Sequence, residues 1–196
     1  MKQTELIIGI GIVLLMVVRL NVMYPYASLL ITILTLVLAM LYSVFSFGLL
    51  NQIRFRNLLK KESYKGISTL RLIGTIGTGF VLSIISISIL FKFQRWPYGS
   101  INLLIGLVSI VPIIAVVIIK YIQHKNKMYS ALLVRLSIIF AMGLLLYFTK
   151  SETILEMTYR DFPEYIDAVK NEMKDPDNLE LRQITNEVRL KMDAAR

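Results

Sequence analysis

Residues 27–50 read ASLLITILTLVLAMLYSVFSFGLL, twenty-four positions without a charged side chain. A helix rises about 1.5 Å per residue, so a stretch of this length is long enough to cross the roughly 30 Å of hydrocarbon in a bilayer. Because lipid offers the backbone no hydrogen-bond partners, the chain satisfies its own N–H and C=O groups there by forming a helix. The stretch therefore predicts a membrane-spanning helix.

Four further stretches have the same character, which gives five predicted spans at about 6–23, 27–50, 72–91, 101–119 and 131–148. The 196-residue chain is 56% hydrophobic and only 18% charged, a composition outside the range of an ordinary soluble domain. We therefore predict an all-α polytopic membrane helix bundle over residues 1–149, followed by a small, charged, helical C-terminal tail over residues 150–196.

The first apolar stretch has a cleaved signal peptide as its alternative interpretation. It contains Arg19, and no small-residue cleavage pattern follows it. We interpret it as a retained helix whose Arg19 side chain extends to the membrane interface. Tyr24 and Tyr26 are then expected at headgroup level, and Pro25 is expected to break the helix between the first two spans.

Positive charge is unevenly distributed along the chain. Residues 1–149 contain 14 Lys and Arg but only two acids, whereas residues 150–196 contain 8 basic and 11 acidic side chains. Most basic residues of the first part fall in the segments that join span two to span three and span four to span five. Lys and Arg in short loops stay on the cytoplasmic side. This rule predicts a bacterial inner-membrane protein with a cytoplasmic N-terminus and, after five spans, a periplasmic tail.

The segment between spans two and three is the most basic loop. Its predicted cytoplasmic residues are Arg54, Arg56, Lys60, Lys61 and Lys65, with Phe55, Leu58 and Leu59 between them. These charges fix the orientation of the chain, and the alternative is that the loop also lies on anionic membrane lipids. Nucleic-acid binding is not expected, because the topology accounts for the net charge of +9.

Small residues occur at helical spacing in span three. Gly74 and Thr78 form one small-x-x-x-small pair, and Thr75 and Gly79 form another. Such pairs let two helices approach closely, so we interpret this face as a helix-packing surface, with a substrate-lining surface as the alternative. Pro112 is expected to kink span four.

Residues that carry chemistry are scarce. No Asp, Glu, Lys or His lies at mid-depth in a predicted span, which disfavours a proton relay or a coupled transporter. His124 is the single histidine and lies in a basic loop, and the chain contains no Cys. No familiar catalytic motif is found. We therefore predict no enzyme activity, no cofactor and no metal site.

The turn between spans three and four has a distinctive sequence, FKFQRWPYG at residues 91–99. The residues expected at the membrane interface are Lys92, Arg95, Trp96, Pro97 and Gly99. An interfacial Trp, a Pro that ends a helix and a Gly in the turn suit a tight hairpin between two spans.

This turn resembles the Phe-Lys-x-x-His-Trp-Pro-Gly turn that joins the two membrane helices of the gliding-motility and type IX secretion motor subunit L of Bacteroidota. The resemblance covers about residues 72–119. It implies an inner-membrane protein of Bacteroidota-like lineage with the hairpin turn in the periplasm. Arg95 stands where that family has His, Tyr98 is inserted before the Gly, and the family's membrane glutamate has no counterpart in span three or four, so the resemblance does not extend to motor activity.

The tail is predicted to form two or three helices. Asp161 and Asp177 are each followed three residues later by Glu, a capping-box arrangement. Apolar residues then recur at helical spacing in both segments, and they include Met173 in the first and Ile184 in the second. We expect a helical hairpin that packs on itself and against a protein partner or a second copy, or alternatively lies on the surface without a partner.

Three classes of function agree with these features. The favoured class is a non-enzymatic scaffold or assembly subunit of an envelope complex. The second is a channel or transporter for a small molecule or ion, and the third is a membrane-bound regulator or lipid-associated protein. The first two classes predict different surroundings for the small-residue face of span three. A scaffold buries this face in protein, whereas a channel or transporter uses it to line a wet cavity.

Overall fold

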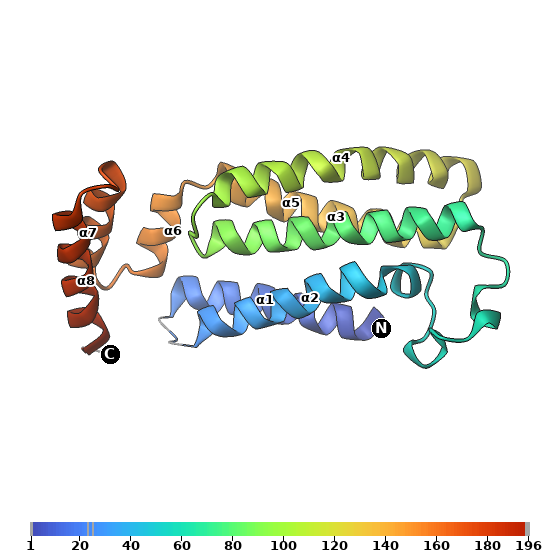
Figure 1. Cartoon of the computed structure of the whole chain (residues 1–196), viewed down its shortest axis with the longest axis horizontal. Helices are drawn as coiled ribbons and strands as arrows, with labels where there is room; N and C mark the ends of the chain where they lie inside the picture. The colour runs from blue at the N-terminus through green and yellow to red at the C-terminus, as the bar shows by residue number, and fades with distance from the viewer. Residues whose placement is uncertain (1, 23, 25, 195–196) are drawn as a thin grey trace.

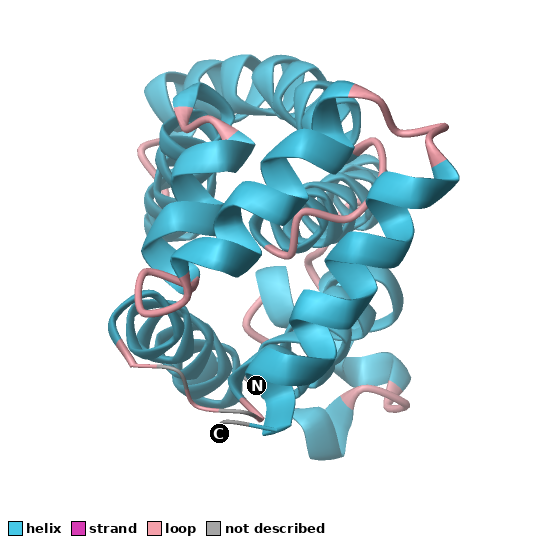
Figure 2. Ribbon diagram, turned by 90° about the vertical axis from the view of Figure 1, so that its left-hand side faces the viewer, coloured by secondary structure: helices cyan, strands magenta, loops and turns pink. Residues whose placement is uncertain are grey.

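A computed structural model describes residues 2–22, 24 and 26–194 of the chain. Within those residues it contains helices and loops but no strands (Figure 2). The helices are α1 (Lys2–Asn21), α2 (Ala27–Leu50), η1 (Phe55–Asn57), η2 (Lys61–Tyr64), α3 (Thr69–Phe93), α4 (Gly99–His124), α5 (Lys127–Phe148), α6 (Ser151–Thr158), α7 (Pro163–Lys174) and α8 (Leu179–Ala194). Met23 and Pro25, including the expected helix break at Pro25, lie outside the described residues.

Five of these helices, α1 to α5, are long and apolar enough to cross a membrane. This confirms the prediction of an all-α membrane helix bundle. Several helices run beyond the predicted spans because polar residues cap them outside the apolar stretch. The Ser68 hydroxyl accepts a hydrogen bond from the Arg71 backbone N–H at the start of α3, and the Asn126 side chain accepts one from the Met128 N–H at the start of α5.

The bundle has two chemically different ends (Figure 1). We call the end formed by the start of α1, the loop 51–68 and the α4–α5 turn the basic end. We call the end formed by the α1–α2 turn, the α3–α4 turn and α6 the tail end. Helices α2 and α3 pack most extensively, α4 and α5 pack on α3 and on each other, and α1 packs on α2. Helices α1 and α5 are not among the extensively packed pairs.

The interior of the bundle is apolar and so is much of its outside. Ile31, Leu82, Ile85, Leu103 and Leu136 are fully buried. Large apolar side chains also cover the outer faces of α1, α2 and α4, where several are more than half exposed. A protein surrounded by water rarely exposes so much contiguous apolar surface, whereas hydrocarbon is an adequate solvent for it. The five helices therefore fit an integral membrane protein.

The contact between α2 and α3 depends on the absence of a side chain at Gly79. A β-carbon added there would lie 2.1 Å from the Ser46 Cβ and 2.4 Å from the Tyr42 carbonyl oxygen. Thr75 and Thr78 are buried next to this contact, whereas Gly74 is exposed. Small residues therefore bring α2 and α3 together, with Gly74 outside the contact.

Helix α4 continues through Pro112 as a single helix. Pro112 is exposed on the outer side of the bundle. It lacks the N–H that would bond to the carbonyl of Val108, one turn earlier.

The tail forms the predicted helical hairpin, α7 against α8, but the helix starts differ from the expected ones. Phe162 is the N-cap of α7 and makes no side-chain cap hydrogen bond; Pro163 occupies the first turn and its fixed φ suits that position. Asn178 caps α8, because its side-chain oxygen accepts from the backbone N–H groups of Glu180 and Leu181 at 3.0 and 3.3 Å. The capping roles predicted for Asp161 and Asp177 are wrong.

A small apolar cluster holds the tail together. It contains Leu155, Tyr165, Ile166 and Met192, with Phe162, Val169 and Val188 at its edge. Met173 and Ile184 are each 44% exposed, contrary to the predicted stripes. Thr185 faces α7 in place of Ile184, and its hydroxyl donates to the Ala168 carbonyl at 3.3 Å. The face of α8 that packs against α7 therefore includes Thr185 and differs from the face that the spacing of its apolar residues predicts.

We expect Gly79→Ala to lower the melting temperature of the detergent-solubilised protein by several degrees. The added methyl group overpacks the α2–α3 contact, which costs about 1–3 kcal/mol in packed interiors. Gly77→Ala is the matched control on the same helix, because a β-carbon there meets nothing within 4 Å. Equal melting temperatures for the two variants would contradict the close contact at Gly79.

Candidate functional site

A buried ion pair joins α1 to α5 near the basic end. The Arg135 Nε and Nη2 groups donate to the two carboxylate oxygens of Glu5 at 2.7 and 2.8 Å. The Glu5 and Arg135 side chains are only 9% and 16% exposed. A bidentate pair of this geometry is the strongest hydrogen-bonded form of a salt bridge. It links two helices whose backbones do not pack extensively on each other.

Tyr42 of α2 completes this site. Its hydroxyl donates to Glu5 Oε1 at 2.9 Å, and the Tyr42 side chain is 3% exposed. Glu5 thus accepts hydrogen bonds from two other helices. The Arg135 guanidinium keeps its third nitrogen, Nη1, without a hydrogen bond to any residue that the structure describes. An arginine carries five N–H donors, so donors remain for another acceptor.

Sequence reasoning missed this pair. In the sequence, Glu5 immediately precedes the first predicted span and Arg135 lies just inside the fifth. The only signal in the sequence is general: an ionisable residue at the edge of an apolar segment needs a partner. Because the two residues are 130 positions apart, only the fold identifies each as the partner of the other.

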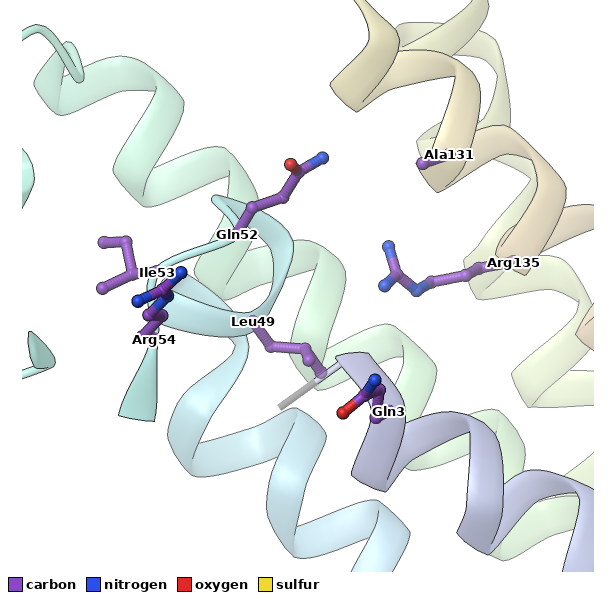
Figure 3. A pocket seen from close by; sticks show the side chains of 7 residues that line it. All are labelled: Gln3, Leu49, Gln52, Ile53, Arg54, Ala131 and Arg135. Atoms are coloured by element: carbon purple, nitrogen blue, oxygen red, sulfur yellow. The ribbon is translucent and has the colours of Figure 1, made fainter. Parts of the chain in front are cut away.

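Arg135 borders a polar vestibule that opens at the basic end. The vestibule has a volume of about 300 Å³ and is lined by Gln3, Leu49, Gln52, Ile53, Arg54, Ala131 and Arg135. Figure 3 shows the Arg135 side chain extending from α5 toward the side of the vestibule formed by Gln3, Leu49 and Gln52. Gln52 follows α2 with a positive φ of 60°, a conformation in which the chain turns sharply after the helix.

A second, larger cavity begins on the other side of the ion pair. This groove has a volume of about 590 Å³ and is bounded by α1, α2, α3 and α5. Its wall is mainly aliphatic, and its polar members are Glu5, Thr35, Tyr42, Ser86 and Arg135. Ala131 and Arg135 line both spaces. The vestibule and the groove therefore meet at one face of α5.

The tail end has a separate polar cluster around Lys92. We expected the Lys92 side chain to reach outward to headgroups, but it is 4% exposed. Its ammonium donates to the hydroxyls of Ser100 at 2.9 Å and Ser151 at 3.2 Å. Helix α6 covers the end of α3, so the nearest acceptors for Lys92 lie inside the protein. This contact ties the start of the tail to the α3–α4 hairpin.

Arg19 is also held within the protein rather than extended alone to the interface. Its guanidinium donates to the Gln94 side-chain oxygen and lies 5.7 Å from the centre of the Phe93 ring. Gln94 in turn accepts a hydrogen bond from Ser28 at 2.9 Å. These contacts join α1, α2 and the end of α3.

The α3–α4 turn contains the other predicted interfacial residues. Trp96 is 39% exposed and packs edge-on against Phe91, with ring centres 4.9 Å apart, and Pro97 is exposed. A Gly in the turn suits a tight hairpin, but the left-handed positions of this turn are not at Gly99. Instead Arg95 and Tyr98 have positive φ angles of 57° and 60°. Gly99 is buried, and it leaves no room for a side chain: a β-carbon there would lie 2.9 Å from the Phe91 carbonyl oxygen.

The tail contacts both this turn and the end of α1. The Arg95 guanidinium lies 5.7 Å from the centre of the Tyr159 ring, and Arg160 donates to the Asn21 carbonyl at 2.7 Å. Burial, and then the neighbouring Tyr159, raise the pKa of the Tyr165 phenol above its usual range, while Arg95 acts in the opposite direction. The Tyr165 phenol therefore stays uncharged to a higher pH than an exposed tyrosine does.

The residues of the predicted basic loop are all exposed: Arg54, Arg56, Lys60, Lys61 and Lys65. Leu58 is buried, and its carbonyl accepts a hydrogen bond from the Tyr64 hydroxyl at 2.6 Å. Leu59 is fully exposed. The hydrogen bond from Tyr64 to Leu58 thus holds the loop together, and Arg54 is the charged residue of the loop that lines the vestibule.

Fold and site together define a helical membrane protein with a paired charge between two spans and a tail beyond one end. Comparison with models of known protein families, with curated proteins and with solved structures finds no match for this chain. Its function is therefore inferred from its own residues.

We expect Glu5→Gln and Arg135→Gln each to destabilise the protein strongly. Each change leaves the other charge buried without its partner, which costs about 3–5 kcal/mol in comparable buried pairs. The double variant should be more stable than the sum of the two single changes predicts. Thermal unfolding of all four proteins in one detergent measures this coupling. Additive effects would show that the two side chains do not stabilise each other.

Proposed function

We propose that this chain is a non-enzymatic assembly subunit of an envelope complex in a bacterial inner membrane. In this proposal the five-helix bundle is the anchor and the α7–α8 hairpin is the element that meets another envelope protein. The basic end faces the cytoplasm, because its short loops carry most of the Lys and Arg. The tail then lies in the periplasm.

The observation that carries the proposal is the position of α7 and α8. They stand beyond the tail end of the bundle and are joined to it through α6 (Figure 1). Leu179 and Leu190 of α8 are 71% and 66% exposed. They are eleven residues apart, which is close to three helical turns, so they share one face. Met192 faces α7, which leaves the leucine face available to a partner.

Burial of the small residues in α3 also supports an assembly role over a pathway for ions or small molecules. Thr75 and Thr78 are 3% and 5% exposed, and Gly79 contacts α2 directly. In a channel or transporter that used this face of α3 for its pathway, the same residues would have to line a water-filled space. Its packing against α2 favours the assembly role over the channel alternative.

The predicted orientation is tested by labelling single cysteines, since the chain contains none of its own. Gln183→Cys in α8 and Arg56→Cys in the basic loop both occupy exposed positions. We expect a membrane-impermeant maleimide to label Gln183→Cys in intact spheroplasts and Arg56→Cys only after lysis. Denatured samples, in which both must react, are the control. The reverse pattern would overturn the orientation.

The assembly role is tested by photo-crosslinking in cells. We expect a photoreactive residue at Leu179 or Leu190 to yield the same crosslinked envelope protein, identified by mass spectrometry. Asp167 is an exposed control on α7, and it should not yield that product. Leu190→Glu should abolish the crosslink from position 179, because it replaces one of the two exposed leucines on this face with a charge. Identical products from all three positions, or none from the leucines, would contradict the proposal.

A further inference from the structure

We propose that the vestibule and the groove together form a binding site for one anionic phospholipid. The lipid phosphate lies in the vestibule against Arg54 and Arg135, and one acyl chain lies in the groove between α1 and α5. This inference goes beyond the assembly role proposed above and does not depend on it.

The groove has the size and the wall that an acyl chain needs. Its volume of about 590 Å³ is within the range of roughly 300–1,000 Å³ found for small-molecule sites. Along α1 it extends from Leu6 to Leu14, a rise of about 12 Å. The bordering residues Ile10, Val134 and Ile138 are each more than half exposed. A lipid chain can therefore enter from the side, between α1 and α5.

The vestibule has the chemistry that an anionic headgroup needs. Its polar lining consists of two arginines and two glutamines, without an acid. Glu5 occupies two nitrogens of Arg135, and the remaining nitrogen makes no hydrogen bond to a described residue. An arginine N–H group donates to a phosphate oxygen as it does to a carboxylate oxygen, so this nitrogen can bind a phosphate. The loop 51–68, which contributes Arg54 to the vestibule, has five Lys and Arg and one acid, and this excess of positive charge attracts anionic over zwitterionic lipid.

One observation connects the halves of the site. Ala131 and Arg135 line both spaces, so a headgroup and its chain can occupy them at once.

A cavity-filling substitution tests the proposal without disturbing the ion pair. Gly9 lines the groove, and a β-carbon there meets nothing within 4 Å. Gly9→Leu therefore adds a side chain that lines the groove and has open space at its Cβ. Gly77→Leu is the matched control, since Gly77 is equally open but belongs to α3 outside the groove. Arg54→Gln removes one charge from the vestibule at an exposed position.

The measurement is native mass spectrometry of the full chain in detergent, titrated with phosphatidylglycerol or with phosphatidylcholine of the same acyl chains. We expect one phosphatidylglycerol per chain and weaker binding of phosphatidylcholine. Gly9→Leu should lose the bound lipid, Gly77→Leu should keep it, and Arg54→Gln should bind phosphatidylglycerol about fivefold more weakly. Glycerol 1-phosphate, which has the headgroup charge without a chain, should not displace the lipid.

Three results would overturn the inference. Equal lipid binding by Gly9→Leu and Gly77→Leu would place the lipid outside the groove. Equal affinity for the two lipids, unchanged by Arg54→Gln, would remove the role of the vestibule. Displacement by glycerol 1-phosphate would show a phosphate site without an acyl chain. Photo-crosslinking at Leu179 and Leu190 is independent of all three results, so failure of one proposal does not imply failure of the other.

Discussion

The structure depends on one constraint: a charge that lies between apolar helices needs a partner there. Glu5 and Arg135 satisfy each other through two hydrogen bonds, and Tyr42 adds a third to the carboxylate. Helices in lipid gain little from hydrophobic association, because the surrounding chains are as apolar as their side chains. The salt bridge between α1 and α5 therefore stabilises the association of two helices that do not otherwise pack closely. The groove lies between these helices beside the ion pair, where Glu5 and Arg135 also line it.

The same reasoning explains the tail end of the bundle. Lys92 and Arg19 lie near the ends of their spans, and each is bonded to polar groups of other helices instead of extending alone. Lys92 reaches Ser151 at the start of α6, which anchors the tail to the hairpin between α3 and α4. Polar contacts thus stabilise both ends of the bundle, whereas small and aliphatic residues pack its middle.

The two proposals use different parts of this design. The assembly role uses the tail, where two leucines on one face of α8 are left exposed. The lipid site uses the basic end, where the unoccupied donors of Arg135 meet a basic loop and an apolar groove begins. A lipid bound between α1 and α5 would fill the space that the ion pair alone spans. It would then stabilise the anchor from which the tail extends.

Sequence alone determined the membrane class, the five spans and the helical tail, because hydropathy and helical periodicity are properties of neighbouring residues. It also indicated small residues in α3, of which Thr75, Thr78 and Gly79 are buried in the structure. Tertiary structure decided the rest. The pairing of Glu5 with Arg135 across 130 positions, the inward direction of Lys92 and the cap at Asn178 all depend on which polar groups come within hydrogen-bond distance. Those distances exist only once the helices have packed.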